Sequence, residues 1–166
     1  MSELFDVCEK VSALSQFDLV DQAWENLAPN LTNAIPVQDY QLGGLIFRLC
    51  FSDEVIKEKI AIAFSHLEIP LVQTPDLTIR VWDVKATGTR MPALDWSLIN
   101  SNGYLGYDQS PVYLQYAGSA GLLNMLHTER KVAYFMTRDT TALPLWVIGA
   151  PLSTILSISR SSSFLA

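Results

Sequence analysis

Cysteine is scarce in this chain. Only Cys8 and Cys50 are present, far apart and outside any CxxC pair or cluster with histidine. CxxC pairs and Cys/His clusters are the arrangements in which thiolates hold zinc or carry redox chemistry, so neither a metal site nor a redox motif is predicted. We expect two free thiols, with Cys50 in the core, because unpaired cysteine is among the most frequently buried residues.

Basic residues are also few. Eleven Lys and Arg stand against seventeen Asp and Glu, which gives a net charge of −6. The basic residues are scattered and form no stripe that could follow a phosphate backbone. Nucleic acid is therefore not expected as a partner.

The sequence has no long apolar run. The longest one, residues 142–152, contains two prolines and is far shorter than the ~20 residues that cross a bilayer. Near the start, Glu3, Asp6 and Glu9 interrupt the apolar residues, so the basic flank and apolar centre of a signal peptide are absent. These absences predict a cytoplasmic protein without a membrane partner.

Nucleotide-binding motifs are missing. None of the eight glycines is followed by lysine, and no GxGxxG occurs. A P-loop needs the lysine to neutralise the phosphates that its backbone N–H groups hold. A GxGxxG turn binds the pyrophosphate of a dinucleotide through backbone N–H groups at the start of a helix. The sequence therefore predicts no nucleotide and no other cofactor.

Histidine, the commonest general base, occurs twice. His66 and His127 are far apart in sequence, and no spacing brings either one to a carboxylate such as Asp83, Asp95 or Glu129. We expect both histidines to be exposed polar residues and the chain to have no catalytic residues. A small hydrolase- or transferase-type enzyme that uses His127 or His66 with a carboxylate is the alternative.

Apolar residues, in contrast, are plentiful. They make up 49% of the 166 residues, which is enough for one folded domain with its own core. We expect a single α+β domain over residues 1–152, followed by a truncated helix and a Ser-rich tail over residues 153–166.

The spacing of the apolar residues predicts mixed secondary structure. Helical spacing indicates helices over residues 17–31 and 53–67, the second one capped by Asp53. Alternation indicates strands over residues 45–51, 77–84, 104–107, 112–116, 122–126 and 132–136. The polar residues 128–131 are typical of a hairpin turn. We therefore predict a mainly antiparallel sheet with helices packed on one face.

Aromatic and apolar side chains suggest an interface. A short helix that begins at Pro151 carries apolar residues on one face, and too few turns follow to hold it unless it packs on something. We expect this face to be mobile or to pair with another copy. The possible interface consists of Trp82, Trp146, Leu152, Ile155 and Leu156. Core packing is the ordinary role of aromatics at alternate strand positions and remains the alternative for Trp82.

Three segments, residues 75–92, 124–142 and 143–156, resemble the region ahead of the kinase module in bacterial proteins related to HPr serine kinase. The matching residues are Ile79, Trp82, Asp83, Thr87, Gly88, Thr89, Met91 and Pro92, then Leu143, Pro144, Ala150, Pro151 and Leu152. None of these motifs is catalytic, so the order of the segments carries the resemblance.

The resemblance implies a non-catalytic regulatory or docking domain. Its partner would be a P-loop kinase domain, a peptide or a small effector. In such relatives the Ala-Pro-Leu helix continues and leads to a P-loop, whereas here residues 157–166 are Ser-rich, so no functional residue is carried over. We expect either a free-standing leading domain or the product of a shortened reading frame, and a remnant without function is a further alternative.

Overall fold

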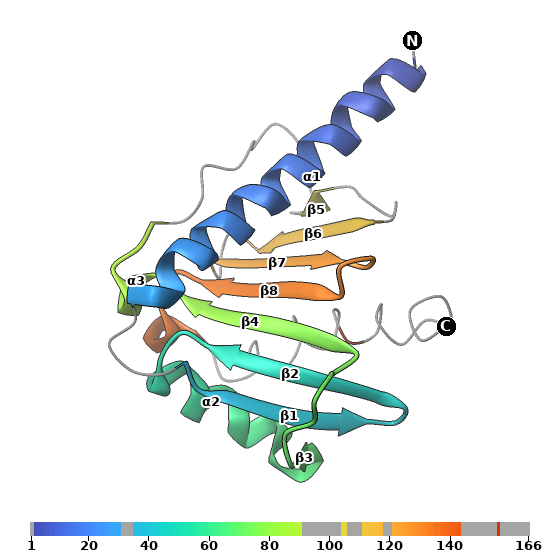
Figure 1. Ribbon diagram of the computed structural model, residues 1–166. Helices are drawn as coiled ribbons and strands as arrows, with labels where there is room; N and C mark the ends of the chain where they lie inside the picture. Colours follow the sequence, from blue (N-terminus) through green and yellow to red (C-terminus); the bar gives the residue numbers. More distant parts are fainter. Residues whose placement is uncertain are drawn as a thin grey trace.

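The computed structural model describes residues 2–30, 35–90, 104–105, 111–117, 121–143 and 156. The described residues form one sheet of eight strands in the order β3-β1-β2-β4-β8-β7-β6-β5. Helix α1 crosses one face of this sheet, and helix α2 lies on the other (Figure 1).

The helices are α1 (Ser2–Leu27), α2 (Glu54–Phe64) and α3 (Val84–Thr87), with 3-10 turns η1 (Ala28–Asn30), η2 (Ser65–Leu67) and η4 (Thr140–Ala142). The strands are β1 (Val37–Leu42), β2 (Leu45–Phe51), β3 (Glu68–Ile69), β4 (Leu77–Asp83), β5 (Tyr104–Leu105), β6 (Val112–Ala117), β7 (Leu122–His127) and β8 (Val132–Thr137). The predicted strands over 45–51, 77–84, 104–107, 112–116, 122–126 and 132–136 therefore all overlap observed strands, although Val84 belongs to α3 and residues 106–107 lie outside the described residues.

The sheet is mainly antiparallel, which confirms the predicted α+β class. Strands β5 to β8 form the expected meander, and β1 and β2 form a further hairpin. Two neighbouring pairs, β2 with β4 and β4 with β8, run parallel. Helix α2 makes the first parallel pair possible, because a parallel pair needs a crossover connection rather than a tight turn.

Two cores cover the two faces of the sheet. The α1-side core contains Phe17, Val20, Trp24, Trp82, Val84, Val112, Leu114, Leu123, Met125, Tyr134 and Met136. The α2-side core contains Tyr40, Leu45, Phe47, Leu49, Phe51, Ile56, Ile60, Leu77, Ile79, Val81, Leu122, Leu126, Ala133, Phe135, Leu143 and Leu156. Helices thus pack on both faces, and the expectation of one covered face was wrong. Central strand β8 is apolar on both sides, as is typical of a strand buried between two layers, whereas β4 carries Thr78 and Arg80 beside Trp82 on its α1 side.

Helix α1 is longer than the sequence pattern indicates. It begins at Ser2 and ends at Leu27, ahead of Pro29 in η1, whereas the apolar spacing predicted a helix over residues 17–31. Phe17, Val20 and Trp24 bury its second half against the sheet. The first half leads away beyond β5 (Figure 1), and its apolar residues do not continue the stripe that starts at Phe17.

Candidate functional site

The carboxyl ends of the three parallel strands lie side by side. Strands β2, β4 and β8 stop at Phe51, Asp83 and Thr137, and polar residues stand at or directly after each end. Parallel strands most often carry ligand sites at this edge, because loops with free polar groups converge there. This edge of the sheet is therefore the candidate location for a ligand-binding or catalytic site.

Asp83 is the central polar side chain of this edge. It is buried, and each carboxylate oxygen accepts a backbone hydrogen bond: Oδ1 from the N–H of Ala86 and Oδ2 from the N–H of Thr140, both at 3.0 Å. One bond caps α3 and the other holds the start of η4. Both oxygens of the Asp83 carboxylate are thus engaged with the backbone.

Ser52 and Asp53 are used in the same manner. The Oγ of Ser52 accepts a hydrogen bond from the N–H of Asp83 and donates one to Asp53, each at 3.0 Å. Asp53 accepts from the N–H of Ile56 at 3.0 Å and so caps α2, as predicted. Lys59 donates to the carbonyl oxygen of Thr140 at 2.7 Å. These polar groups join strand ends to helix starts.

Trp82 lies beside this cluster, inside the protein. Its side chain is 1% exposed, its indole N–H donates to Thr87 Oγ1 at 3.0 Å, and its ring meets that of Trp24 edge-on at 5.8 Å. Trp82 is therefore a core residue, and its assignment to an interface was wrong. The sequence pattern of β4 does not reveal that the face of the strand that carries Trp82 is covered, but in the structure α1 packs over that face.

Leu156 is likewise buried in the α2-side core, together with Leu143. It packs within its own chain, which contradicts, for this residue, the expectation of a mobile or self-pairing face. The other residues of the possible interface, Trp146, Leu152 and Ile155, lie outside the described residues.

His127 is buried rather than exposed, contrary to expectation. Its ring meets that of Phe17 edge-on at 5.2 Å, and Nδ1 accepts a hydrogen bond from the N–H of Arg130 at 3.3 Å. Burial, assisted by the positive charge of Arg130, lowers the pKa of His127. The ring is therefore held neutral beneath α1, which packs over this end of β7.

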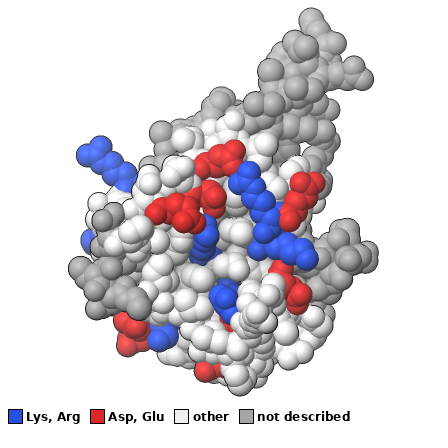
Figure 2. All heavy atoms as spheres, viewed as in Figure 1, with Lys and Arg blue, Asp and Glu red and all other residues white. Residues whose placement is uncertain are grey.

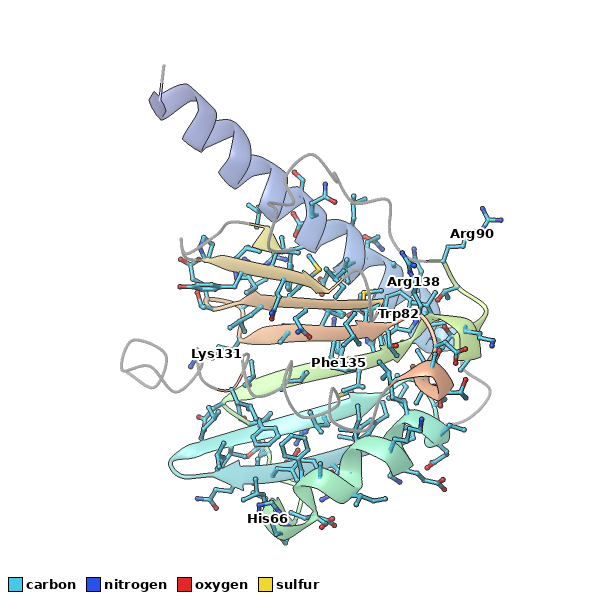
Figure 3. The ribbon with its side chains drawn as sticks, turned by 180° about the vertical axis from the view of Figure 1, so that it is seen from behind. His66, Trp82, Arg90, Lys131, Phe135 and Arg138 are labelled. Carbon is cyan, nitrogen blue, oxygen red and sulfur yellow. The ribbon has the colours of Figure 1, made fainter. Side chains whose placement is uncertain are left out.

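His66 is exposed, as expected, and lies beyond α2 far from Trp82 and Arg138 (Figure 3). Within the part of the chain that the structure describes, neither histidine shares a hydrogen bond with a carboxylate. Of the imagined carboxylate partners, Asp83 is occupied, Glu129 is exposed at the hairpin turn, and Asp95 lies outside the described residues. Among the described residues, the geometry therefore does not bring a histidine and a carboxylate together as the alternative enzyme would require.

Charged residues gather where α1 crosses the sheet (Figure 2). Arg80 on β4 contacts Asp21 at 2.9 Å and Glu25 at 3.0 Å, and it also donates to the hydroxyl of Tyr134. Further along, Arg130 contacts Asp18 of α1 at 2.9 Å. The three acidic residues follow one side of the helix, so these ion pairs hold α1 in its diagonal orientation. The sequence pattern did not predict this network, because its local signal is limited to the helical spacing of the three acidic residues.

Groups that bind metals are not assembled in the described ranges: no three or more His, Cys, Asp or Glu side chains there could hold a metal ion. Cys50 has a free thiol and is half-buried against the α1-side core, in line with the expectation for it. None of the helices in those ranges has the length and apolar character needed to cross a membrane.

Comparison with known proteins identifies no relative. No protein-family model matches the chain, and no curated protein or solved structure matches it significantly.

Proposed function

We propose that this chain is a non-catalytic docking domain of the bacterial cytoplasm that binds a P-loop kinase domain through the outer face of α2. One observation carries the proposal: Val55 and Ile62 are 54% and 76% exposed. They are seven residues apart, which is about two helical turns, so they lie on the same side of the helix.

The inner side of α2 is already occupied. Ile56 and Ile60 are buried in the α2-side core and fix the helix on the sheet. Val55 and Ile62 therefore cannot turn inward without losing that packing. An amphipathic helix normally exposes polar residues on its outer side, and a pair of large apolar residues there is typical of a helix that docks into a groove on another protein.

The cluster at the carboxyl ends of the parallel strands supports the same proposal by contrast. The polar side-chain atoms of Asp83, Ser52 and Asp53 form hydrogen bonds with backbone groups and with one another. A catalytic group needs an atom free to meet a substrate. The resemblance to the leading region of HPr serine kinase-related proteins supplies the class of partner.

Ile62→Glu is expected to weaken binding to an isolated kinase domain related to HPr serine kinase by at least about tenfold, because a charge would have to be buried in the contact. Calorimetric titration measures the change. Leu71→Glu is the matched control, since Leu71 is also an exposed large apolar residue but lies outside α2. Equal binding by wild type and Ile62→Glu, or no binding by either protein, would reject α2 as the docking surface for such a kinase domain.

The purified chain is expected neither to bind Mg·ATP nor to transfer its phosphate. The sequence contains no Gly-Lys step, so no P-loop lysine or hydroxyl is available to the phosphates and the metal. Calorimetry with Mg·ATP should give only heats of dilution. A saturable heat, or label transferred from γ-labelled ATP to any protein, would contradict the proposal of a domain without chemistry.

A further inference from the structure

His127 lies under the helix that covers one face of the sheet. It is 4% exposed at the end of β7, on the side that α1 crosses (Figure 1). Its ring meets the ring of Phe17 edge-on at 5.2 Å, and the ring of Tyr134 meets Phe17 edge-on at 5.6 Å. The guanidinium of Arg130 lies over the same Phe17 ring, 5.7 Å from its centre. Phe17 thus occupies a socket made by three side chains, one of which is a histidine.

This socket is one of two aromatic anchors that hold α1 on the sheet. The second is Trp24, which meets Trp82 edge-on at 5.8 Å. Among the described residues, α1 contributes Phe17, Val20 and Trp24 to the buried part of the α1-side core, and it contributes none to the α2-side core. Helix α1 can therefore move away from the sheet without opening the α2-side core.

The contacts of His127 require a neutral ring. Nδ1 accepts a hydrogen bond from the backbone N–H of Arg130 at 3.3 Å, so this nitrogen carries no proton. An imidazolium donates from both nitrogens and cannot accept that bond. Protonation would also bury a charge beside the aromatic ring of Phe17 and place it close to the guanidinium of Arg130. The socket therefore loses a hydrogen bond and gains a buried charge when His127 takes up a proton.

The charged groups around His127 act in opposite directions. From the hairpin turn, Glu129 favours the imidazolium and Arg130 disfavours it, and from α1 both Asp18 and Asp21 favour it. Burial is the largest influence, and together with Arg130 it outweighs the three carboxylates. The pKa of His127 therefore lies below its ordinary value.

The neighbouring elements supply no further anion to stabilise an imidazolium. Among the described residues, β6 places the apolar Val112 opposite His127, and Lys131 is exposed at the end of the turn. Asp21 is already engaged with Arg80 at 2.9 Å and with the hydroxyl of Tyr134. The carboxylates of α1 thus neutralise arginines and leave the imidazole to the apolar socket.

We propose that His127 is the titrating element of a pH-sensitive latch: in weakly acidic solution it takes up a proton, the socket releases Phe17, and α1 opens away from the sheet while the α2-side core stays folded. Because the pKa of His127 is lower when α1 is closed than in the open form, where the ordinary value of about 6.5 applies, protons bind preferentially to the open form. The latch is therefore closed above about pH 6.5 and is released progressively as the pH falls below that value. The inference is independent of the proposed docking through α2, which lies on the other face of the sheet.

Hydrogen exchange of the full chain at pH 7.5 and pH 5, corrected for the intrinsic pH dependence of exchange, tests the latch. Amides from Phe17 to Leu27 should lose protection about threefold to thirtyfold at pH 5, since thirtyfold is roughly the most that one group of ordinary pKa about 6.5 supplies over this window. Amides of β2, which packs in the α2-side core, should keep their protection within about twofold.

Variants of the two histidines assign the effect. His127→Phe keeps an aromatic ring beside Phe17 but takes up no proton, so the protection of α1 should be equal at pH 5 and pH 7.5. His127→Gln, which is also neutral and keeps an acceptor oxygen, gives the same comparison if the loss of the hydrogen bond from Arg130 weakens the first variant at both pH values. His66→Phe is the matched control, because His66 is exposed beyond α2, and it should respond like wild type (Figure 3).

Three results would overturn the latch. The first is equal protection of α1 at both pH values in wild type. The second is a loss that persists in His127→Phe and His127→Gln, because carboxylates such as Asp18 and Asp21 would then be responsible. The third is a parallel loss of protection in β2, which would show that acid unfolds the whole domain instead of opening α1.

Discussion

Asp39→Asn is expected to lower the free energy of unfolding by about 3 kcal/mol, measured by urea denaturation. Removing one partner of a buried ion pair usually costs about 3 to 5 kcal/mol, because it leaves the other charge buried without compensation. The Arg48 side chain is 23% exposed, so water screens part of its charge and the lower end of the range applies.

The cost is high because Asp39 joins three segments of the chain. It is fully buried on β1 directly opposite Arg48 on β2, which donates to both carboxylate oxygens at 2.7 and 3.0 Å. The N–H of Val72, in the segment between β3 and β4, donates to Asp39 Oδ2 at 2.8 Å. Arg48 in turn donates to the carbonyl oxygen of Val72 at 2.6 Å. The substitution therefore loosens this segment as well as the β1–β2 hairpin.

The same carboxylate predicts how stability depends on pH. Burial by itself would raise the pKa of Asp39, but the hydrogen bonds from Arg48 and Val72 outweigh it and hold the pKa below its usual value. A lowered folded-state pKa means that the contribution is fully present above the unfolded pKa of about 3.9 and is lost as pH falls through the folded value. The difference in stability between wild type and Asp39→Asn should therefore shrink below about pH 4.

A double-mutant cycle provides the control. Arg48→Met alone leaves the Asp39 carboxylate buried without its counter-charge, Asp39→Leu alone leaves the Arg48 guanidinium without its own, and the double variant with both substitutions replaces the pair by apolar groups. The double variant should lose less stability than the sum of the single variants, because neither charge is left behind. Additive losses, or a loss below about 1 kcal/mol for Asp39→Asn, would show that the pair contributes little beyond an exposed ion pair.

Local sequence patterns were enough to predict much of the sheet. Residues 45–51 alternate cleanly and form β2 with those bounds, and residues 77–84 form β4 with one residue less. Asp53 caps α2 as its position ahead of an apolar stripe indicated. In each case the signal lies within a few residues of the element that it specifies.

The missed features depend on residues far away in sequence. Strand β1 reads as polar because its buried Asp39 is satisfied only by Arg48 and Val72. Arg80 made β4 look exposed on one side, yet α1 covers that side and pairs Arg80 with Asp21 and Glu25. The same covering helix buried Trp82 and His127, and a pattern within β4 or β7 contains no information about it.

The order of the strands in the sheet could not be predicted from local sequence patterns either. The parallel neighbours β2, β4 and β8 bring Ser52, Asp83 and Thr140 into one cluster, although these residues are far apart along the chain. A polar residue after each strand was visible in the sequence. Its role depended on which strands end together, and only the topology supplies that.

Asp83→Ala is expected to cost about 3 kcal/mol of unfolding free energy, because it removes two hydrogen bonds to a carboxylate: it leaves the buried N–H of Thr140 unpaired and takes the α3 cap away from the N–H of Ala86. Asp53→Ala is the matched control. Asp53 accepts one backbone N–H at a helix start, so its loss should cost about 1 kcal/mol. Hydrogen exchange gives an independent measure, and the Thr140 amide should exchange faster in Asp83→Ala.

Asp83→Asn makes the same experiment informative about function. An amide group matches the shape of the carboxylate but offers one acceptor oxygen, so one of the two N–H donors must face the amide nitrogen. Most of the stability lost in Asp83→Ala should therefore also be lost in Asp83→Asn. If Asp83→Asn were as stable as wild type, the carboxylate would not be needed to hold the ends of β4 and β8 together. Its burial among Ser52, Asp53 and Lys59 would then require a chemical role, and the proposal of a domain without catalysis would have to be withdrawn.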